Sequence, residues 1–254
     1  MKNSHIALLS MATLFSAATP CVAFADTVKL HGATTVIDVV ITPYRNAVQG
    51  ATGHTLELVG NGTGKGLVDL SDGKADASLI SEPLDIALAA AATAGKTIDP
   101  ATLKVYEIRK DEIMFVVHPS NPVNSLTWEQ IRDIHTGKIT NWKQVGGKDG
   151  PINVYSDALT GGTRAMVKKV VLGGAEYGDN VKSLTAVKRV AELVTQDTQG
   201  IGGVGRGFVD SAKDKVVQTK KIERPLAFVT VGEASPKVKQ VIEAYRAQVA
   251  KAGK

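Results

Sequence analysis

The sequence predicts an α/β fold built around a parallel sheet. Two observations lead to this prediction. Apolar and polar residues alternate at 27–31, 55–59 and 75–80, which is the pattern of strands. A segment of helix length follows each of these strands. Strands that alternate with helix-length connections form parallel sheets, because a parallel crossover needs a dozen or more residues.

Polar turns follow each of the three strands. They are Thr34-Thr35, the glycine-rich run 60–66 and Ser81-Glu82. The carboxyl ends of parallel strands lie along one rim of an open α/β sheet, and ligands bind at that rim. We therefore expect these three turns to meet at a ligand site.

The remaining elements follow from periodicity and from cap residues. The first helix, 36–48, contains Pro43, so we expect a kink or a late start there. Thr127 and Gln130 form a capping box at the start of a helix. The full set of further elements is a helix reaching about Leu70, helices at 85–94, 128–135, 183–195 and 236–249, and strands at 105–118, 200–205 and 224–231.

The stretch 156–164 is the most informative part of the second half of the chain. It lies between an apolar strand, 151–155, and a helix that begins near Ala165. A glycine-rich turn at a helix start presents free backbone N–H groups and a positive dipole end, which suits an anion. An ordinary N-capped turn has the same composition, so the stretch alone leaves both interpretations open.

Composition and charge exclude several classes of protein. The chain has 254 residues, of which 43% are hydrophobic and 22% charged, as is typical of a folded globular protein. Its net charge of +5 is dispersed, with no basic run interleaved with aromatics, so nucleic-acid binding is not expected. Cys21 is the only cysteine and no histidines stand at metal-ligand spacing, so we expect no metal site and no cofactor.

Residues 1–25 have the pattern of a signal peptide. Lys2 precedes an apolar run, and Ala23-Phe24-Ala25 is a small-x-small cleavage motif. We expect cleavage before Asp26, which removes Lys2 and no acid and lowers the net charge to +4. A periplasmic or secreted protein is predicted. A lipoprotein anchored through Cys21 is disfavoured, because Pro20 stands where a lipoprotein signal has a small residue. An uncleaved anchor is the remaining alternative.

Six blocks of this sequence resemble the periplasmic phosphate-binding proteins of ABC transporters and the wider phosphate-binding-like family of solute-binding proteins. The blocks are 32–35, 60–66, 117–123, 136–142, 160–164 and 200–205. The resemblance implies the type II periplasmic-binding-protein fold, in which two lobes, each a mostly parallel sheet flanked by helices, enclose a cleft. Lobe 1 would comprise 26–111 and 223–254, and lobe 2 would comprise 112–222.

The resemblance also implies a function and a set of binding residues. The protein would be a monomer without catalytic activity that captures phosphate or a related small oxyanion and delivers it to an ABC permease. Hydroxyls and backbone N–H groups would hold the ion. The residues carried over or considered for the site are Thr34, Thr35, Thr63, Ser81, Glu82, Asp157, Thr160, Gly161, Gly162, Thr163 and Arg164.

Three positions depart from the family pattern. Glu82 lies where the family has an Asp that accepts the proton of the anion, and Gly161 replaces a Ser. Asp157 lies where the family has the arginine that balances the charge of phosphate. A like-charge contact at about 4 Å costs ~1 to 4 kcal/mol, so this reversal disfavours a dianion unless another cation takes its place. His31, Arg109 and Arg164 are candidates for that cation.

The charge reversal keeps alternative functions open. The same fold could bind a different small solute or serve in sensing or adhesion. A phosphatase-like enzyme is a remote alternative, since Ser156 adjoins Asp157. The sequence has no Gly-x-Ser-x-Gly elbow, and no histidine is placed to act as its base.

Overall fold

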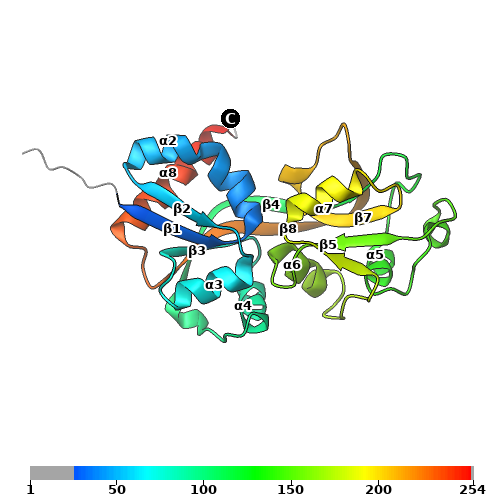
Figure 1. Cartoon of the computed structure of the whole chain (residues 1–254), viewed down its shortest axis with the longest axis horizontal. Helices are drawn as coiled ribbons and strands as arrows, with labels where there is room; N and C mark the ends of the chain where they lie inside the picture. The colour runs from blue at the N-terminus through cyan, green and yellow to red at the C-terminus, as the bar shows by residue number, and fades with distance from the viewer. Residues whose placement is uncertain (1–25, 253–254) are drawn as a thin grey trace, which may run out of the picture.

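A computed structural model describes residues 26–252 and shows two lobes that share one eight-stranded sheet (Figure 1). The strand order is β2-β1-β3-β8-β4-β7-β5-β6. The strands are β1 (Thr27–Gly32), β2 (Thr55–Val59), β3 (Ala77–Ile80), β4 (Leu103–Val117), β5 (Asn153–Ser156), β6 (Val181–Ser183), β7 (Gly200–Gly205) and β8 (Lys215–Val231). The α/β two-lobed prediction is therefore confirmed.

Helices cover both faces of the sheet in each lobe. They are α1 (Thr34–Val36), α2 (Thr42–Thr52), α3 (Thr63–Ser71), α4 (Leu84–Thr93), α5 (Trp128–His135), α6 (Gly162–Val170), α7 (Val187–Val194) and α8 (Pro236–Ala252). A π-helical segment, η1 (Ile37–Ile41), joins α1 to α2, and three short 3₁₀ turns lie at Pro100–Thr102, Trp142–Val145 and Arg206–Phe208.

Lobe 1 contains β1–β3, α1–α4 and α8. Its central strand β1 pairs in parallel with β2 and β3, as the strand–helix alternation predicts. On one face, the apolar side of α8 packs with α1, η1 and α2 over β1, and Val238, Val241, Ile242 and Tyr245 are buried there. On the other face, α3 and α4 pack over β3 and β8 through Leu67, Ala87 and Ala91.

Lobe 2 contains β5–β7 and α5–α7. Its central strand β5 pairs in parallel with β6 and β7. The helix α7 covers one face through Val187, Val190 and Val194. On the other face α5 and α6 bury Ile131, Ile134 and Met166 with the fully buried Trp142.

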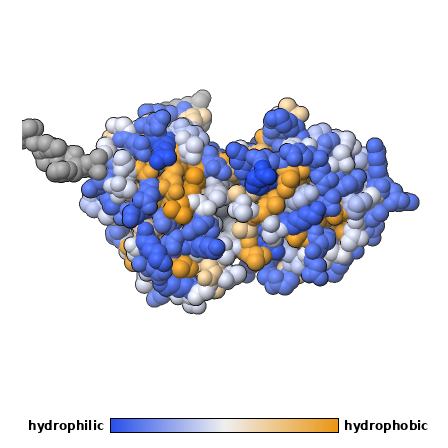
Figure 2. Space-filling model, in the orientation of Figure 1, coloured by the Kyte–Doolittle hydropathy of each residue, from blue (hydrophilic) through white to orange (hydrophobic). Residues whose placement is uncertain are grey.

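The two long strands β4 and β8 run through both lobes and pair with each other antiparallel (Figure 1). Their register runs from Leu103 opposite Val231 to Val117 opposite Lys215, with irregularities after Glu107 and after Ile113. On the face shown in Figure 2, the surface narrows to a notch between the lobes. The predicted lobe limits at 111/112 and 222/223 fall within this crossing and stay predictions.

Most predicted elements differ from the structure by a few residues at their ends, and three differences have a clear physical reason. The helix expected from Ser183 begins only at Val187, because Val181–Ser183 pairs with β5 as the edge strand β6. The strand expected from Arg224 begins at Lys215, since its charged first half pairs with β4. Pro43, at the first turn of α2, lacks an N–H donor, and the chain passes through the π-helical segment just before it.

The predicted signal peptide lies outside the described residues. Within residues 26–252, none of the helices combines the length and the hydropathy that a bilayer crossing demands.

Close packing of α3 on β1 requires glycine at position 66. A Cβ atom there would overlap the Cα atom of Gly32 and lie 2.8 Å from its backbone nitrogen. We expect Gly66→Ala to lower the free energy of unfolding by about 1–3 kcal/mol, as overpacking does. Gly50→Ala in α2 is the control, because a Cβ atom at Gly50 meets nothing within 4 Å. Urea unfolding of the two variants measures the difference, and equal stability would contradict the packing argument.

Candidate functional site

A small pocket lies where turns from both lobes meet. The cavity volume open to water-sized molecules is about 10 Å³. Pockets for organic ligands are far larger and have volumes from ~300 Å³ upward. The pocket therefore suits a group of a few atoms. Its lining includes six of the predicted site residues, namely Thr34, Thr35, Ser81, Asp157, Gly161 and Gly162, together with Ala33, Gly62, Ala158, Thr185, Ala186 and Val187.

Four helix starts line this pocket. Thr34 begins α1, Gly62 precedes α3, Gly161 precedes α6 and Ala186 precedes α7, and none of the four N-cap residues provides a capping side chain. The first backbone N–H groups of a helix have no partner within it, and the dipole places partial positive charge at the same end. The turns at the ends of β1, β2, β5 and β6 thus aim hydrogen-bond donors and positive potential at one point.

Two glycines at the start of α6 allow two carboxyl groups to approach closely. A Cβ atom at Gly162 would overlap Glu82 Oε2, and one at Gly161 would overlap Asp157 Oδ2. Glu82 comes from lobe 1, so its contact with Gly162 brings the two lobes together. Its Oε2 atom accepts hydrogen bonds from the backbone N–H of Ser81 at 3.0 Å and from the Ser81 hydroxyl at 3.1 Å.

A buried cation lies next to these carboxyls. Arg224, on β8 at the crossing between the lobes, stands opposite Asp111 of β4. Its Nε and Nη2 atoms donate to Asp111 Oδ2 at 3.0 and 2.8 Å, and its Nη1 donates to the Thr163 hydroxyl at 2.8 Å. The side chains of Arg224 and Asp111 are 0% and 1% exposed. Gly205 makes room for the pair, since a Cβ atom there would lie 2.6 Å from both side chains.

Burial perturbs the two carboxyls beside the pocket. Desolvation raises the pKa of Glu82 to about 7, against the lowering effects of the Thr63 hydroxyl and of Arg224. Desolvation likewise raises the pKa of Asp157 to about 6, and Arg224 again opposes the rise. Both groups feel the charge of Arg224, which Asp111 already pairs. A proton bound to either carboxyl lowers the negative charge beside the pocket, and the raised pKa values make this protonation easier than in water.

The other predicted residues lie at varying distances from the pocket. Thr63 and Thr163 are buried at the starts of α3 and α6. The carbonyl oxygen of Thr160 accepts a hydrogen bond from the backbone N–H of Gly64 at 3.2 Å, which ties the α6 turn to α3 across the lobes. Arg164 lies away from the pocket: its guanidinium stacks on Tyr177 at 3.9 Å and donates to the Ser183 hydroxyl.

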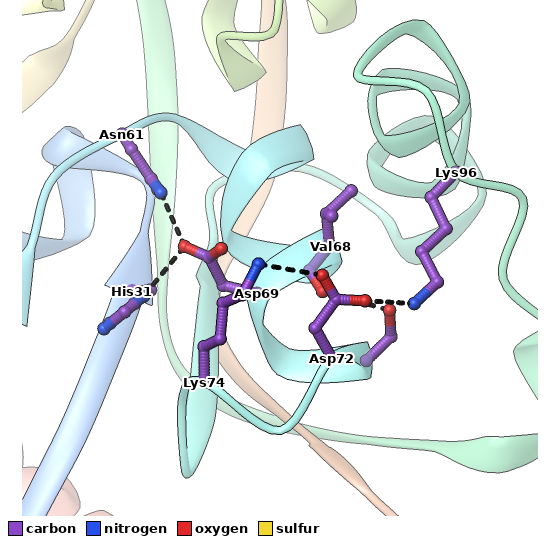
Figure 3. A network of polar contacts seen from close by, with 8 residues as sticks. His31, Asn61, Val68, Asp69, Asp72, Lys74 and Lys96 are labelled. Atoms are coloured by element: carbon purple, nitrogen blue, oxygen red, sulfur yellow. Dashed lines mark hydrogen bonds and ion pairs between the residues drawn. The ribbon is translucent and has the colours of Figure 1, made fainter.

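The two other candidate cations also have different surroundings. The Nδ1 atom of His31 lies 2.8 Å from Asp69 Oδ2, and Asn61 Nδ2 donates to the same oxygen at 2.8 Å (Figure 3). This network ties the end of β1 and the turn after β2 to α3, so it holds two pocket turns in place. Arg109 lines a separate pocket with Arg206 and Glu223.

The sequence analysis did not identify Arg224 and Asp111, the charged pair beside the site, and it also missed Thr185, Ala186 and Val187 at the start of α7. A signal for the charged pair was present, because the lobe limits predicted at 111/112 and 222/223 place both of its residues at the crossing. Charged residues at a buried crossing need partners, and the two crossing strands would supply them to each other. Among residues 26–252, no group of three or more His, Cys, Asp and Glu side chains is arranged to hold a metal ion.

Comparison with known proteins places this architecture in a family. The family model described as "PBP superfamily domain" matches residues 23–252. The chain belongs to the PBP superfamily. The resemblance drawn from the turn motifs is thereby confirmed at the level of the family.

Curated proteins with similar sequences include several phosphate-binding proteins. The phosphate-binding protein PstS of Bacillus subtilis is 26% identical over 136 residues, which cover 54% of this chain and 45% of that protein. PstS of Staphylococcus saprophyticus is 28% identical over 165 residues, which cover 63% and 49%. The chain thus spans about half the length of the curated relatives it matches.

A solved structure of a putative phosphate ABC transporter substrate-binding protein from Clostridium perfringens, with bound phosphate, shares the fold. It superposes with a TM-score of 0.74 at 26% identity, covering 86% of this chain and 92% of that one. An ABC-type phosphate transport receptor from Vibrio cholerae superposes with a TM-score of 0.67 at 24% identity, covering 89% and 96%. The match to the second structure shows the fold alone.

The buried Arg224–Asp111 pair leads to a stability prediction. Arg224→Met leaves Asp111 buried without its cation, and breaking a buried pair in this way costs about 3–5 kcal/mol. Replacing both residues, as in Arg224→Met with Asp111→Leu, should recover most of that loss because no uncompensated charge remains. Urea unfolding of the singles and the double at pH 7 measures the coupling. Additive losses in the double variant would contradict the assignment.

The raised pKa of Glu82 predicts how stability changes with pH. The folded protein holds a proton on Glu82 up to about pH 7, whereas the unfolded chain releases it near pH 4.5, so stability falls as pH rises through this window. The slope is up to about 1.4 kcal/mol per pH unit. Glu82→Gln should remove the contribution of Glu82 to the pH dependence of stability.

The measured quantity is the difference in unfolding free energy between wild type and Glu82→Gln from pH 4.5 to 8. The comparison is needed because His135, whose pKa burial lowers to about 4, acts in the opposite direction below pH 6.5. A difference that stays constant over this pH range would show that Glu82 is not perturbed in the folded state.

Proposed function

We propose that this protein is an exported solute-binding protein that captures phosphate or a related small oxyanion in the pocket between its lobes and delivers it to an ABC permease. It acts by binding and carries out no catalysis. Delivery requires the lobes to close on the ion and open again, which is a hinge motion driven by the higher affinity of the closed state.

The observation that carries this proposal is the convergence of four helix starts on a pocket sized for a few atoms. An ion with oxygens on all sides can accept hydrogen bonds from the hydroxyls of Thr34 and Thr35 of lobe 1 and from the backbone N–H of Gly162 of lobe 2. Because donors come from both lobes, the ion favours the closed arrangement. The pocket is too small for an organic solute.

Arg224 takes the place of the cation that Asp157 replaces. Its guanidinium donates to Thr163, at the start of the helix that forms one wall of the pocket. An arginine on the crossing strand supplies positive charge beside both lobes, whereas an arginine at position 157 would belong to lobe 2 alone. We therefore propose that the reversal at Asp157 moves the cation and preserves the class of ligand.

The protonation state of the site favours phosphate over sulfate. With Arg224 paired to Asp111, the ionised forms of Glu82 and Asp157 repel any anion. Phosphate carries protons near neutral pH and can donate one to a carboxylate, whereas sulfate has none and relies on protons held by the protein. We infer that Glu82 accepts the proton of the bound ion, since it touches the start of α6 from the opposite lobe.

The relatives and the leader support the rest of the proposal. Proteins named phosphate-binding protein PstS share 26% to 28% identity with this chain, and the related Clostridium perfringens structure holds phosphate. A leader cleaved before Asp26 would place the mature protein in the periplasm or outside the cell. We propose that it works there as a monomer beside its permease.

Isothermal titration with phosphate and sulfate at pH 6 and pH 8 tests the proposed function. We expect phosphate to bind at both values. Sulfate should bind about tenfold or more weakly at pH 8 than at pH 6, because each ionised carboxylate near the ion costs ~1 to 4 kcal/mol. Glu82→Gln and Asp157→Asn should each reduce the dependence of sulfate affinity on pH.

Glu233→Gln is the control variant, since this side chain is 79% exposed between β8 and α8 and its replacement also removes one negative charge. It should titrate like the wild type. Absence of phosphate binding at millimolar concentration at both pH values would refute the proposed function. Unchanged pH dependence in both carboxyl variants would instead refute only the roles assigned to Glu82 and Asp157.

A further inference from the structure

A second, much larger pocket lies between α4 of lobe 1 and α6 of lobe 2. Its cavity volume is about 330 Å³, compared with about 10 Å³ for the small pocket. A volume of this size is within the usual range for pockets that bind organic ligands. The two pockets share no lining residue. The larger pocket is therefore a separate feature and not an extension of the oxyanion site.

Apolar groups form much of its wall. Ile86, Ala89 and Ala90 come from α4, and Ala165 and the ring of Tyr177 face them from lobe 2. Leu159, in the turn before α6, lies at the rim and is 66% exposed, which is high for a large apolar side chain. A ligand with an apolar body would cover Leu159 and this wall, and each methylene buried contributes ~0.8 kcal/mol.

Two cations of the pocket lining, Arg164 and Lys169, are outside the ion pairs found among residues 26–252. Lys168 is paired with Glu176, and Asp85 lies in the first turn of α4, where the helix dipole stabilises it. Arg164 has no carboxylate within ion-pair distance among residues 26–252. Its guanidinium is held in place by stacking on Tyr177 and by the hydrogen bond to Ser183.

We propose that this pocket binds an organic monoanion with an apolar body, such as a medium-chain or aromatic carboxylate. The carboxylate pairs with Arg164, and the apolar body lies on Ile86, Ala89 and Leu159. An arginine suits this role because its fixed fork of donors matches a carboxylate and its plane packs against an aromatic ring.

The position of the pocket links such a ligand to lobe closure. Its walls come from both lobes, and Ile86 of α4 already packs in the core of lobe 2. A ligand held between α4 and α6 contacts both only when they are close together. The organic ligand therefore favours the closed arrangement. Because coupling between two sites is reciprocal, the organic ligand raises the affinity for the oxyanion by the same factor as the oxyanion raises the affinity for the organic ligand.

Titration calorimetry of the full mature protein with octanoate, and with octylamine as the cation of matched length, tests this proposal. We expect octanoate to bind and octylammonium not to bind. Ala89→Trp fills the pocket from an exposed helix position and should weaken octanoate binding at least about tenfold. Arg164→Gln should weaken it about tenfold by removing a charge-assisted hydrogen bond.

The control for Arg164→Gln is Lys138→Gln, which also removes one positive charge from lobe 2, at a side chain that is 70% exposed, and should leave octanoate affinity unchanged. Equal binding of octanoate and octylammonium, or octanoate binding that persists in Ala89→Trp, would overturn the proposal. So would absence of octanoate binding at millimolar concentration. These outcomes are independent of the phosphate titration, so this site and the proposed function can fail separately.

Discussion

The buried ion pair between Arg224 and Asp111 is the interaction on which the site depends. It joins the two strands that run through both lobes, at the point where they cross. The pair is retained in an apolar setting because each charge satisfies the other and because Gly205 leaves room for it. Arg224 also donates to Thr163, so the same guanidinium that fixes the crossing positions the first turn of α6. The stability of the crossing and the electrostatics of the pocket therefore cannot be varied independently.

In the binding mechanism that we propose, closure of the lobes has opposite effects on the charges in the pocket. It brings the starts of α1, α3 and α6 together, which strengthens their combined attraction for an anion. It also removes Glu82 and Asp157 from water, and desolvation raises the pKa of both carboxyls. Protons bound by these residues, or brought by the ion, decide which effect prevails. A site of this kind discriminates between ions by the protons they carry as well as by their shape.

Much of the fold and part of the site follow from local sequence patterns. Thr34, Thr35 and Ser81 could be placed together because each follows a strand of a parallel sheet, and such strand ends share a rim. Gly161 and Gly162 were assigned to the same site by the family resemblance, which places their turn on the other lobe. Arg224 could not, because its partners Asp111 and Thr163 lie 113 and 61 residues away and no periodicity encodes a buried charge pair. Arg164 was assigned to the site from its neighbours in sequence, but its side chain turns toward Tyr177, on the opposite side of the turn.

The departure at Asp157 and the position of Arg164 are explained by the same turn. Residues 157–164 form the wall between the small pocket and the large one: Asp157 and Gly161 face the former, and Leu159 and Arg164 face the latter. If Arg224 supplies the positive charge of the small pocket, as we propose, the turn need not supply it, and Arg164 is available to the large pocket. Both pockets have walls from the two lobes, and any ligand that fits either of them acts on the same closing motion. The turn is thus the structural element through which two different anions would be linked.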